Sequence, residues 1–582
     1  MKPFKKLVFG ASVASMVLTS CSGTRTVKEP TVFYSSWESL EQYRCPEWFR
    51  DAKFGLWSHW NGYVVPEAGD WYARNMYIQG KRQYEYHLKN YGHPSKFGYK
   101  DIVELWKADR FNPDSLVALY KGSGAKYIVS LAVHHDNFDL WNSKYQKWNS
   151  VNYGPRKNIT GLWEKAVRKA GLRWGVTSHL ERSWNWFQPS HGADTSGPYK
   201  GVPYDGANPA YQNIYHDTYG MKDDNLAYSI HPPKQWADEY CRRIRDLLLQ
   251  HKPDLFYMDG GIPFGEQGRD LIAWYYNQNI RWHHGSMEAV LAMKNFPFLD
   301  VFHGDFRYGT CVEDVERGRM EGINREPWQT DNSIGDWSWK KGQKYISLKI
   351  FVDQLIDIVS KNGNLLMNIP LRADGSLDGE SVALLKGMGQ WLKVNGEGIY
   401  GTRPYTLFGE GPTMVQGGHY AEMAELTADD FRFTTKGDTV FAFVCGEPKG
   451  EVKIRQFNAL NYHTIQSVSL LGTKEPIKFL QEKDGLVVQM PEVLPSRNAV
   501  CLKIIPKSDM KRSAPEKVLP VPPQRPKPKG TAQLLMRSRK ESGAVFDAFL
   551  LSGLAAAAPD AARTRCAEAR IEGRERNAPC VI

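Results

Sequence analysis

The sequence predicts a (β/α)8-like barrel followed by a C-terminal antiparallel β-sandwich. Between residues 54 and 369, short apolar runs typical of buried strands alternate with longer stretches of helical periodicity, which indicates a parallel sheet with crossover helices. From about Tyr405 the pattern changes to short alternating runs separated by turn residues, which is typical of a sandwich. Polar side chains follow several predicted barrel strands, where barrel enzymes carry their chemistry.

The βα pattern is clearest around residues 254–261. A stretch with apolar residues at helical spacing precedes it and ends at Lys252 and Pro253. Residues 255–258 are an uninterrupted apolar run, which predicts a strand buried on both faces. Asp259 follows at the carboxyl end of this strand, so we expect its side chain at the mouth of the barrel. Capping of the next helix is the alternative role for this residue.

Four more apolar runs predict barrel strands, at residues 54–60, 127–133, 174–178 and 364–369. A helix with one apolar face, from Leu348 to Val359, precedes the last of them. The stretch 182–233 is rich in Gly, Pro, Tyr and Asp and has no clear period. A loop of that length inside a compact domain is usually functional or disordered.

The predicted domain boundaries follow these changes of pattern. Residues 22–404 form the barrel domain and residues 405–505 form the sandwich domain, with strand runs at 431–434, 440–444, 452–454 and 500–505. Residues 506–582 begin as a Pro/Lys-rich linker and continue as an Ala/Arg-rich tail with little amphipathic periodicity. We expect this end of the chain to be disordered, and its pattern indicates no role.

Residues 1–21 resemble a bacterial lipoprotein signal peptide. Lys2, Lys5 and Lys6 precede a short apolar stretch, and the sequence from Leu18 to Cys21 resembles a lipobox. The apolar stretch is shorter than the roughly 20 residues of a membrane span, so we expect export, cleavage before Cys21 and lipidation of its thiol. The protein is then expected in the bacterial periplasm or outer membrane. A simple secretory signal with an incidental cysteine is the alternative.

The net charge of +11 does not indicate a nucleic-acid-binding protein. The leader contributes three lysines, and residues 506–582 carry 15 basic and 8 acidic residues, so residues 7–505 are nearly neutral. The eight cysteines show neither C-x-x-C nor zinc spacing, so no disulfide framework or metal cluster is indicated. Aromatic residues make up 13% of the chain, a share that suits stacking on sugar rings.

Polar side chains gather at four predicted strand ends: His59 with Asp70 shortly after it, His134 with His135, His179, and Asp259. Because parallel strands end on one face of a barrel, all of these side chains point into one pocket. Histidines and carboxylates can bind a metal ion that activates water. Alternatively, imidazoles bind sugar hydroxyls while two carboxylates perform glycoside hydrolysis. The aromatic neighbours of these residues, among them Trp57, Trp60, Trp71 and Tyr257, favour the sugar site.

From about residue 45 to residue 505 the chain resembles the α-L-fucosidases of glycoside hydrolase family 29. Six ordered blocks carry the resemblance, at residues 48–60, 70–77, 134–145, 327–337, 357–368 and 391–401. The resemblance implies a retaining exo-α-L-fucosidase, which releases L-fucose from fucosylated glycans through a covalent fucosyl-enzyme intermediate. It implies no cofactor and no metal.

The resemblance also implies residue roles. Asp259 matches the nucleophile, Trp71 matches an aromatic substrate-binding position, and three histidines match positions that bind fucose hydroxyls: His59, His134 and His135. Two further expected substrate-binding residues differ from most of the family, because Asp70 replaces a Glu and Tyr257 stands where relatives often have Trp. The third strand also carries His179 where many relatives have Tyr. These departures leave the reaction unchanged and the exact substrate open.

The acid/base residue is less clearly marked. Many relatives have a Trp-Glu pair where this chain has Trp328 and Gln329, so no carboxylate stands there. Upstream, residues 312–318 resemble a block whose Glu is the acid/base in one branch of the family, which predicts Glu316. The remaining candidates in this region are Glu313, Glu321 and Glu326.

Three other functions stay in consideration. The first is an exo-glycosidase of the same fold that acts on another sugar or on a sulfated fucan. The second is a metal-dependent barrel hydrolase that uses His59, His134, His135 and Asp259. A surface glycan-binding protein without catalysis is the third, and Asp259 together with the Glu-rich loop argues against it.

Overall fold

The computed structural model describes residues 32–218, 233–296, 303–421 and 424–507. The predicted signal peptide with Cys21 lies outside these residues, as does nearly all of the predicted linker and tail. Within the described residues, no helix is both long enough and apolar enough to cross a bilayer.

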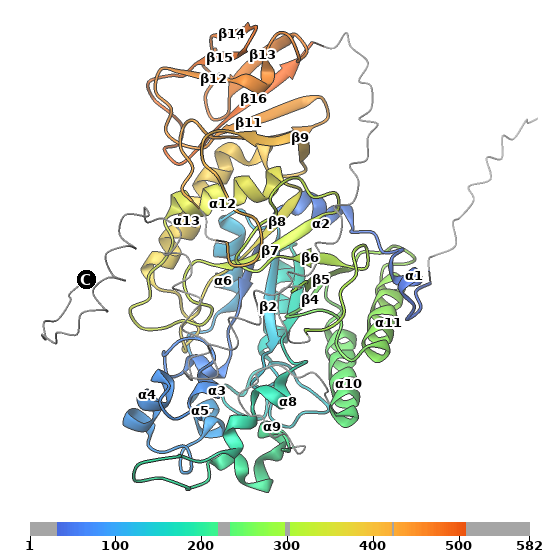
Figure 1. Cartoon of the computed structure of the whole chain (residues 1–582), viewed down its shortest axis with the longest axis vertical. Coiled ribbons are helices and arrows are strands. Elements are labelled where there is room, and N and C mark those ends of the chain that lie inside the picture. The colour runs from blue at the N-terminus through green and yellow to red at the C-terminus, as the bar shows by residue number, and fades with distance from the viewer. Residues whose placement is uncertain (1–31, 219–232, 297–302, 422–423, 508–582) are drawn as a thin grey trace, which may run out of the picture. The chain divides into compact units, whose positions relative to one another are not determined.

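Eight parallel strands form a closed barrel in sequence order, which confirms the predicted fold (Figure 1). The ring closes where β8 pairs with β1, with Leu365 opposite Phe54. The strands are β1 (Phe54–Ser58), β2 (Tyr127–Val133), β3 (Arg173–Ser178), β4 (Leu255–Met258), β5 (Val290–Lys294), β6 (Val312–Asp314), β7 (Trp328–Ser333) and β8 (Gly363–Asn368). The five predicted strands are all present, and β2 and β4 have the predicted bounds.

In the described part of the chain, seven helices have ten or more residues: α4 (Arg82–Tyr91), α6 (Pro113–Gly122), α7 (Ile159–Lys169), α10 (Lys234–His251), α11 (Glu266–Trp282), α12 (Leu348–Ser360) and α13 (Gly379–Asn395). Shorter helices are α1 (Trp37–Leu40), α2 (Glu47–Ala52), α3 (Tyr72–Asn75), α5 (Tyr99–Leu105), α8 (Ser183–Trp186) and α9 (Gln212–Tyr215). The 3-10 turns are η1 (Gly62–Val64), η2 (Gln188–His191), η3 (Asp205–Ala207), η4 (Pro209–Tyr211), η5 (Gly396–Gly398) and η6 (Arg455–Phe457).

Five of the eight barrel strands are buried along their whole length, which explains their continuous apolar runs. All residues of β1, β2, β4, β5 and β8 are buried, as expected when helices cover the outside of a parallel barrel and side chains fill its interior. Gly55 is required on β1 because a Cβ there would lie 2.3 Å from the Tyr127 ring. Its register partner on β2 is Tyr127 itself, so a small residue faces a large one.

The sequence did not predict β5, β6 and β7. β6 has only three residues, and β7 reads Trp-Gln-Thr-Asp-Asn-Ser, so neither is an apolar run. Both are strands because each pairs in parallel with a neighbour on either side. No helix follows β6, and residues 315–327 form a loop at the mouth of the barrel.

The C-terminal strands form two antiparallel sheets, which confirms the predicted sandwich. The larger sheet has the order β13-β16-β11-β10-β9 and the smaller sheet the order β12-β15-β14. The strands are β9 (Arg403–Glu410), β10 (Phe431–Lys436), β11 (Thr439–Val444), β12 (Glu451–Ile454), β13 (Ile465–Leu470), β14 (Phe479–Glu482), β15 (Gly485–Gln489) and β16 (Val500–Pro506).

Strand β11 contributes to two cores because its side chains alternate between the faces of its sheet. Val440, Ala442 and Val444 pack in the core between the two sheets. Phe441 and Phe443 belong instead to the hydrophobic core of the barrel domain. The opposite faces of one sheet therefore join the sandwich to the barrel, next to α12 and α13 (Figure 1).

A buried ionic cluster strengthens this junction. Asp357 of α12 accepts hydrogen bonds from Lys361 Nζ at 2.9 Å and from Arg432 Nε of β10 at 2.7 Å. Asp357 is fully buried, and Lys361 and Arg432 are nearly so. Burial opposes ionisation of this carboxyl, but the two cations outweigh that effect and lower its pKa.

We predict that Asp357→Ala lowers the free energy of unfolding by about 3–5 kcal/mol, because two buried cations lose their shared carboxylate. The loss is expected above the ordinary Asp pKa of about 4 and should fade as the pH falls below it. Chemical denaturation measures the difference. Glu397→Ala is the control, since it breaks the more exposed Glu397–Lys503 pair and should cost no more than about 0.5 kcal/mol. Equal losses in both variants would contradict the assignment.

Candidate active site

The predicted functional side chains converge at the carboxyl ends of the barrel strands. His59, His134 and His179 follow β1, β2 and β3, and Asp259 follows β4. Lys294 is the last residue of β5, and Glu316 lies two residues after β6. Because all of these strands are parallel neighbours, their ends lie on one face of the barrel. The structure thus brings together residues that are up to 257 positions apart in sequence.

Asp259 lies nearly buried among cationic and polar groups. Its Oδ1 accepts a hydrogen bond from Lys294 Nζ at 2.7 Å, and its Oδ2 accepts one from the Arg182 guanidinium. His179 Nδ1 lies 3.2 Å from Oδ2. Burial raises the pKa of this carboxyl, but the neighbouring Lys294, His179 and Arg182 outweigh it and hold the pKa well below its ordinary value. Asp259 is therefore an ionised carboxylate at neutral pH.

His135 supports Asp259 through Arg182 and also lies beside it, with His135 Nε2 3.5 Å from Asp259 Oδ2. Its Nδ1 faces the carbonyl oxygen of His179 and must donate to it, so Nδ1 carries the proton. Nε2 is then free to accept the hydrogen bond from Arg182 Nε, at 3.0 Å. Burial and the adjacent Arg182 hold the pKa of His135 well below its ordinary value. A neutral imidazole thus orients the guanidinium that contacts Asp259.

Lys294 connects Asp259 to a second carboxyl. Its Nζ lies 2.6 Å from Glu316 Oε2 and 2.7 Å from Asp259 Oδ1, so these two oxygens are at most about 5.3 Å apart. The same Nζ lies 3.4 Å from Asp331 Oδ2. Lys294 is only 2% exposed. One buried ammonium group therefore fixes the spacing of the two carboxyls.

Glu316 has the opposite protonation tendency to Asp259. Burial raises its pKa above the ordinary value, and the nearby Asp331 and Asp259 raise it further, although Lys294 acts against them. The two carboxyls share one lysine and yet have pKa values displaced in opposite directions. Such a pair can supply an ionised carboxylate and a protonated acid at the same pH.

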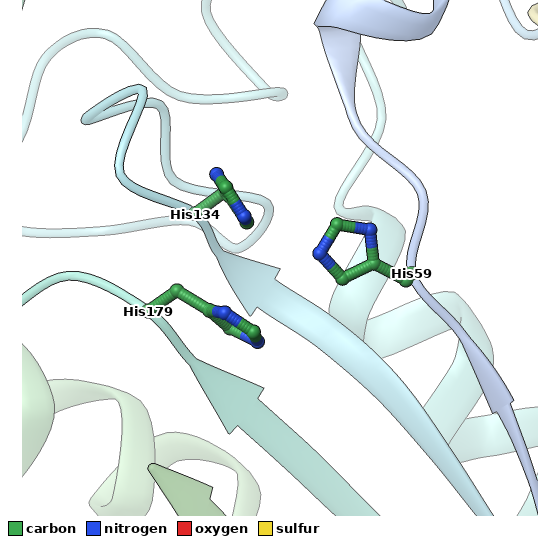
Figure 2. Close-up of side chains that lie close together, drawn as sticks. All are labelled: His59, His134 and His179. Atoms are coloured by element: carbon green, nitrogen blue, oxygen red, sulfur yellow. The ribbon is translucent and has the colours of Figure 1, made fainter. Parts of the chain in front are cut away.

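Three imidazoles form the wall of the site on the β1–β3 side (Figure 2). The ring centroids of His59 and His134 are 4.9 Å apart, those of His134 and His179 are also 4.9 Å apart, and those of His59 and His179 are 5.3 Å apart. Each ring has one buried nitrogen without a hydrogen-bond partner among the described residues: His59 Nδ1, His134 Nδ1 and His179 Nε2. These nitrogens are available for a ligand.

Burial and the neighbouring imidazoles keep the pKa values of His59 and His134 well below their ordinary value, so both rings are neutral. A neutral imidazole can donate or accept a hydrogen bond from a hydroxyl. The same geometry can hold a metal ion, for which the described residues offer two groups: His59 with His134 and His179, and His135 with His179 and Asp259. The predicted metal set is thus divided between two groups.

The other predicted substrate-binding residues lie close to the histidines, but not all of them are open to the mouth. Trp71 packs edge-on against His135, with ring centroids 6.0 Å apart. Asp70 accepts a hydrogen bond from the Tyr63 hydroxyl at 2.8 Å, and burial together with the nearby Asp336 raises its pKa to about 7. Tyr257 is fully buried, and its hydroxyl donates to Asp331 Oδ2 at 3.1 Å rather than pointing into open space.

The alternative acid/base candidates are less well placed. Glu321 is exposed, and Glu326 is exposed and lies beside Arg325. Glu313 lies near Asn295 Nδ2, at 3.5 Å, and burial raises its pKa to about 7. Glu316, by contrast, contacts the lysine that holds Asp259.

Several residues of the site were not predicted from the sequence. Lys294 ends β5, whose apolar run Val-Leu-Ala-Met is a short signal that could have indicated a strand. Glu181 and Arg182 follow the third strand by a few residues, a position that could have been noticed next to His179. Burial raises the pKa of Glu181 to about 8. Tyr420 lies between the sandwich strands β9 and β10 and donates to Glu316 Oε2 at 2.8 Å. The sequence carries no local signal for this contact.

A hollow of about 440 Å³ adjoins the site and is lined by Arg317, Gly335, Asp336, Trp337, Lys340, Gln343 and Lys344. Its Trp337 ring packs against Trp57 and His59, with centroids 5.4 and 6.1 Å away. The Arg317 guanidinium lies 4.5 Å from the centre of the same indole. Trp337 therefore contacts both this hollow and His59.

Two carboxyls bridged by one lysine at the mouth of a (β/α)8 barrel, with pKa values displaced in opposite directions, are typical of the class of glycoside hydrolases. Comparison with known families agrees with this class. The family described as Alpha-L-fucosidase matches residues 20–397, and the Alpha-L-fucosidase C-terminal domain matches residues 424–505. The chain belongs to the α-L-fucosidase family.

The matches to individual relatives span nearly the whole length of those relatives. The chain is 28% identical to the plasma alpha-L-fucosidase of Pongo abelii over 490 residues, which is 80% of this chain and 90% of that protein. It is 26% identical to the tissue alpha-L-fucosidase of Bos taurus, over 84% and 93% of the two chains. The Thermotoga maritima alpha-fucosidase in complex with fucose superimposes with a TM-score of 0.62, at 26% identity, over 81% of this chain and all of that one.

Proposed function

We propose that the protein is a retaining exo-α-L-fucosidase that releases L-fucose from fucosylated glycans. The observation that carries the proposal is the Lys294 bridge, which holds Asp259 Oδ1 and Glu316 Oε2 at most about 5.3 Å apart. A separation of about 5–5.5 Å is typical of retaining glycosidases, whereas inverting enzymes leave about 6.5–9.5 Å for a water molecule. The opposite pKa displacements of the two carboxyls support the same mechanism.

In the first step, ionised Asp259 attacks the anomeric carbon of the fucoside and forms an ester with it. The glycosidic C–O bond breaks, and protonated Glu316 gives its proton to the departing oxygen. In the second step, Glu316 removes a proton from water, the water oxygen bonds to the anomeric carbon, and the ester to Asp259 breaks. Both carboxyls then return to their starting protonation states.

The surrounding side chains suit the binding of one terminal sugar. The free ring nitrogens of the neutral His59 and His134 match the hydroxyl groups of a pyranose, and His135, Asp70, Trp71 and Tyr257 complete the proposed binding set. Arg182 and Lys294 keep Asp259 ionised. They would also stabilise the carboxylate that is released when the ester breaks.

The leader sequence supports a location for this activity. Its basic start, short apolar stretch and lipobox-like Leu18–Cys21 are the basis for proposing export and attachment to a bacterial membrane through lipid on Cys21. Substrates would then be glycans that reach the periplasm or the cell surface.

The function is tested with protein dialysed against a chelator. We expect turnover of an aryl α-L-fucoside and of α-1,2, α-1,3, α-1,4 or α-1,6 fucosyl oligosaccharides, with the same rate before and after dialysis, because the two carboxyls need no metal. Loss of activity that added Zn²⁺ restores would instead support the metal-dependent hydrolase. Activity on other α- or β-glycosides without activity on fucosides would overturn the sugar assignment.

The hollow beside Trp337 favours a second candidate substrate, a sulfated fucan. Arg317, Lys340 and Lys344 outnumber the single acid Asp336, which pairs with Lys340 at 2.7 Å. A cationic excess next to the sugar site would attract an anionic substituent. Including sulfated fuco-oligosaccharides in the same substrate series compares the two candidates directly, and a preference for them should weaken as the salt concentration rises.

We predict that Asp259→Ala reduces turnover at least about 10³-fold because the covalent path is removed. Azide should yield an inverted fucosyl azide rather than restore the retained product, since no ester can form. Stopped assays with NMR of the anomeric proton measure both outcomes. Asp114→Ala, at an exposed surface position, is the control and should be unaffected. Near-normal turnover in Asp259→Ala would remove this residue from the mechanism.

We predict that Glu316→Ala slows natural fucosides at least about 10²-fold but spares the first step on aryl fucosides with acidic phenols, which leave without a proton. Azide should then rescue the second step, because it needs no base to activate it. Pre-steady-state kinetics on a series of phenols measures the difference.

The control for this prediction is Glu313→Ala, which removes the neighbouring carboxyl whose pKa is also raised. Any change in rate in Glu313→Ala should be the same on fucosides with good and with poor leaving groups. If Glu313→Ala shows the dependence on the leaving group and Glu316→Ala does not, the acid/base role belongs to Glu313.

A further inference from the structure

A segment of the chain between β9 and β10 reaches the barrel mouth. We call residues 417–421 the clamp segment. Gly418 forms an antiparallel bridge with Arg319, whose carbonyl accepts from Gly418 N at 2.7 Å and whose own N–H donates to the Gly418 carbonyl at 3.3 Å. The guanidinium of Arg319, which is 2% exposed, also donates to the carbonyl of Ala421 at 3.2 Å. The clamp segment is therefore tied to the loop that carries Glu316.

The two backbones approach too closely to tolerate side chains at the contact. A Cβ on Gly318 would lie 1.9 Å from the Gly418 carbonyl oxygen, and a Cβ on Gly417 would lie 2.4 Å from Glu321 Cγ and 2.7 Å from Glu321 N. Such distances would force the backbones apart. The glycines on both sides therefore allow the clamp segment to lie directly against the loop.

The clamp segment holds the backbone of Glu316 on both sides. Glu316 N–H donates to His419 Nδ1 at 3.0 Å, and Tyr420 N–H donates to the Glu316 carbonyl at 2.8 Å. His419 Nε2 must then carry the proton, which it donates to the Asn295 carbonyl at 2.9 Å. Burial and the nearby Lys294 lower the pKa of His419 to about 4, so it is neutral and able to accept from Glu316.

The Tyr420 side chain acts on the carboxyl itself. Its hydroxyl donates to Glu316 Oε2 at 2.8 Å, and the same oxygen receives Lys294 Nζ at 2.6 Å. Two donors on one oxygen stabilise negative charge there and disfavour a proton. The transferable proton is therefore directed to Oε1, and the orientation of the carboxyl is fixed.

We propose that Tyr420 is a positioning residue for the acid/base, and that through it the clamp segment sets the orientation and acidity of Glu316. This inference rests on the proposed role of Glu316. Without the hydroxyl, Oε2 keeps only Lys294, the carboxylate form loses a hydrogen bond, and the pKa of Glu316 rises. The acid then remains protonated to higher pH but gives its proton less readily to a poor leaving group.

The test is Tyr420→Phe, assayed as kcat/KM against pH on a poor-leaving-group fucoside and on an acidic aryl fucoside. The basic limb of the profile should move up by about half to one pH unit. The rate on the poor leaving group should fall about 3–10-fold, with little change on the acidic phenol. The melting temperature should stay the same.

The control is Tyr145→Phe, because Tyr145 is 52% exposed and Tyr420 is 48% exposed. It should change neither the pH profile, nor the rates, nor the melting temperature. A basic limb that stays in place in Tyr420→Phe would overturn the proposal.

A second variant changes the clamp without touching Tyr420. Gly417→Ala places a Cβ against Glu321 and should move the clamp segment away, which should reproduce the shifted limb and the dependence on the leaving group. A wild-type profile in Gly417→Ala would count against the clamp. Glu316→Gln distinguishes a failure of the acid/base assignment from a failure of the role proposed for Tyr420. If it keeps full activity on natural fucosides, the acid/base assignment itself fails. If it is inactive there while Tyr420→Phe has the wild-type profile, only the role of Tyr420 fails.

Discussion

The chemistry of the site depends on one buried cation. Lys294 Nζ lies within 3.4 Å of three carboxyls, those of Asp259, Glu316 and Asp331. In a low-dielectric interior, a single ammonium group cannot stabilise three full negative charges at this range. Glu316 is therefore driven towards its protonated form, whereas Asp259 stays ionised. The lysine fixes the distance between the two proposed catalytic carboxyls and also forces them into different protonation states.

The neighbours of each carboxyl decide which of them keeps the proton. On the Asp259 side lie Arg182 and the His179 ring, and both favour the ionised form. On the Glu316 side the additional donor is the neutral hydroxyl of Tyr420, while burial and the charge of Asp331 act in the opposite direction. A positively charged neighbour outweighs a neutral one at similar distance. The nucleophile and the acid proposed for the reaction are thus distinguished by their surroundings, since both are simple carboxyls.

The sandwich is joined to the barrel by contacts that support the clamp segment beside Glu316. Its sheet shares the hydrophobic core of the barrel through Phe441 and Phe443, and Arg432 completes the buried ionic cluster around Asp357. These contacts anchor β10 and β11 beside α12. The loop that leads into β10 can then present the clamp segment at a fixed place beside residues 316–321. A loop supported at its base by a packed domain holds its side chains more firmly than a free loop does.

The sequence by itself determined the barrel, the sandwich and the candidate Asp259, because these depend on local patterns. The runs at 127–133 and 255–258 are strands with the predicted bounds, and Asp259 directly follows the second of them. Tertiary structure alone decided β6 and β7, which are too short or too polar to form apolar runs and are strands only because neighbours pair with them. It also decided the contacts among Lys294, Glu316 and Tyr420. Their 22- and 104-residue separations are bridged by the closure of the barrel and the packing of the sandwich, which no local pattern encodes.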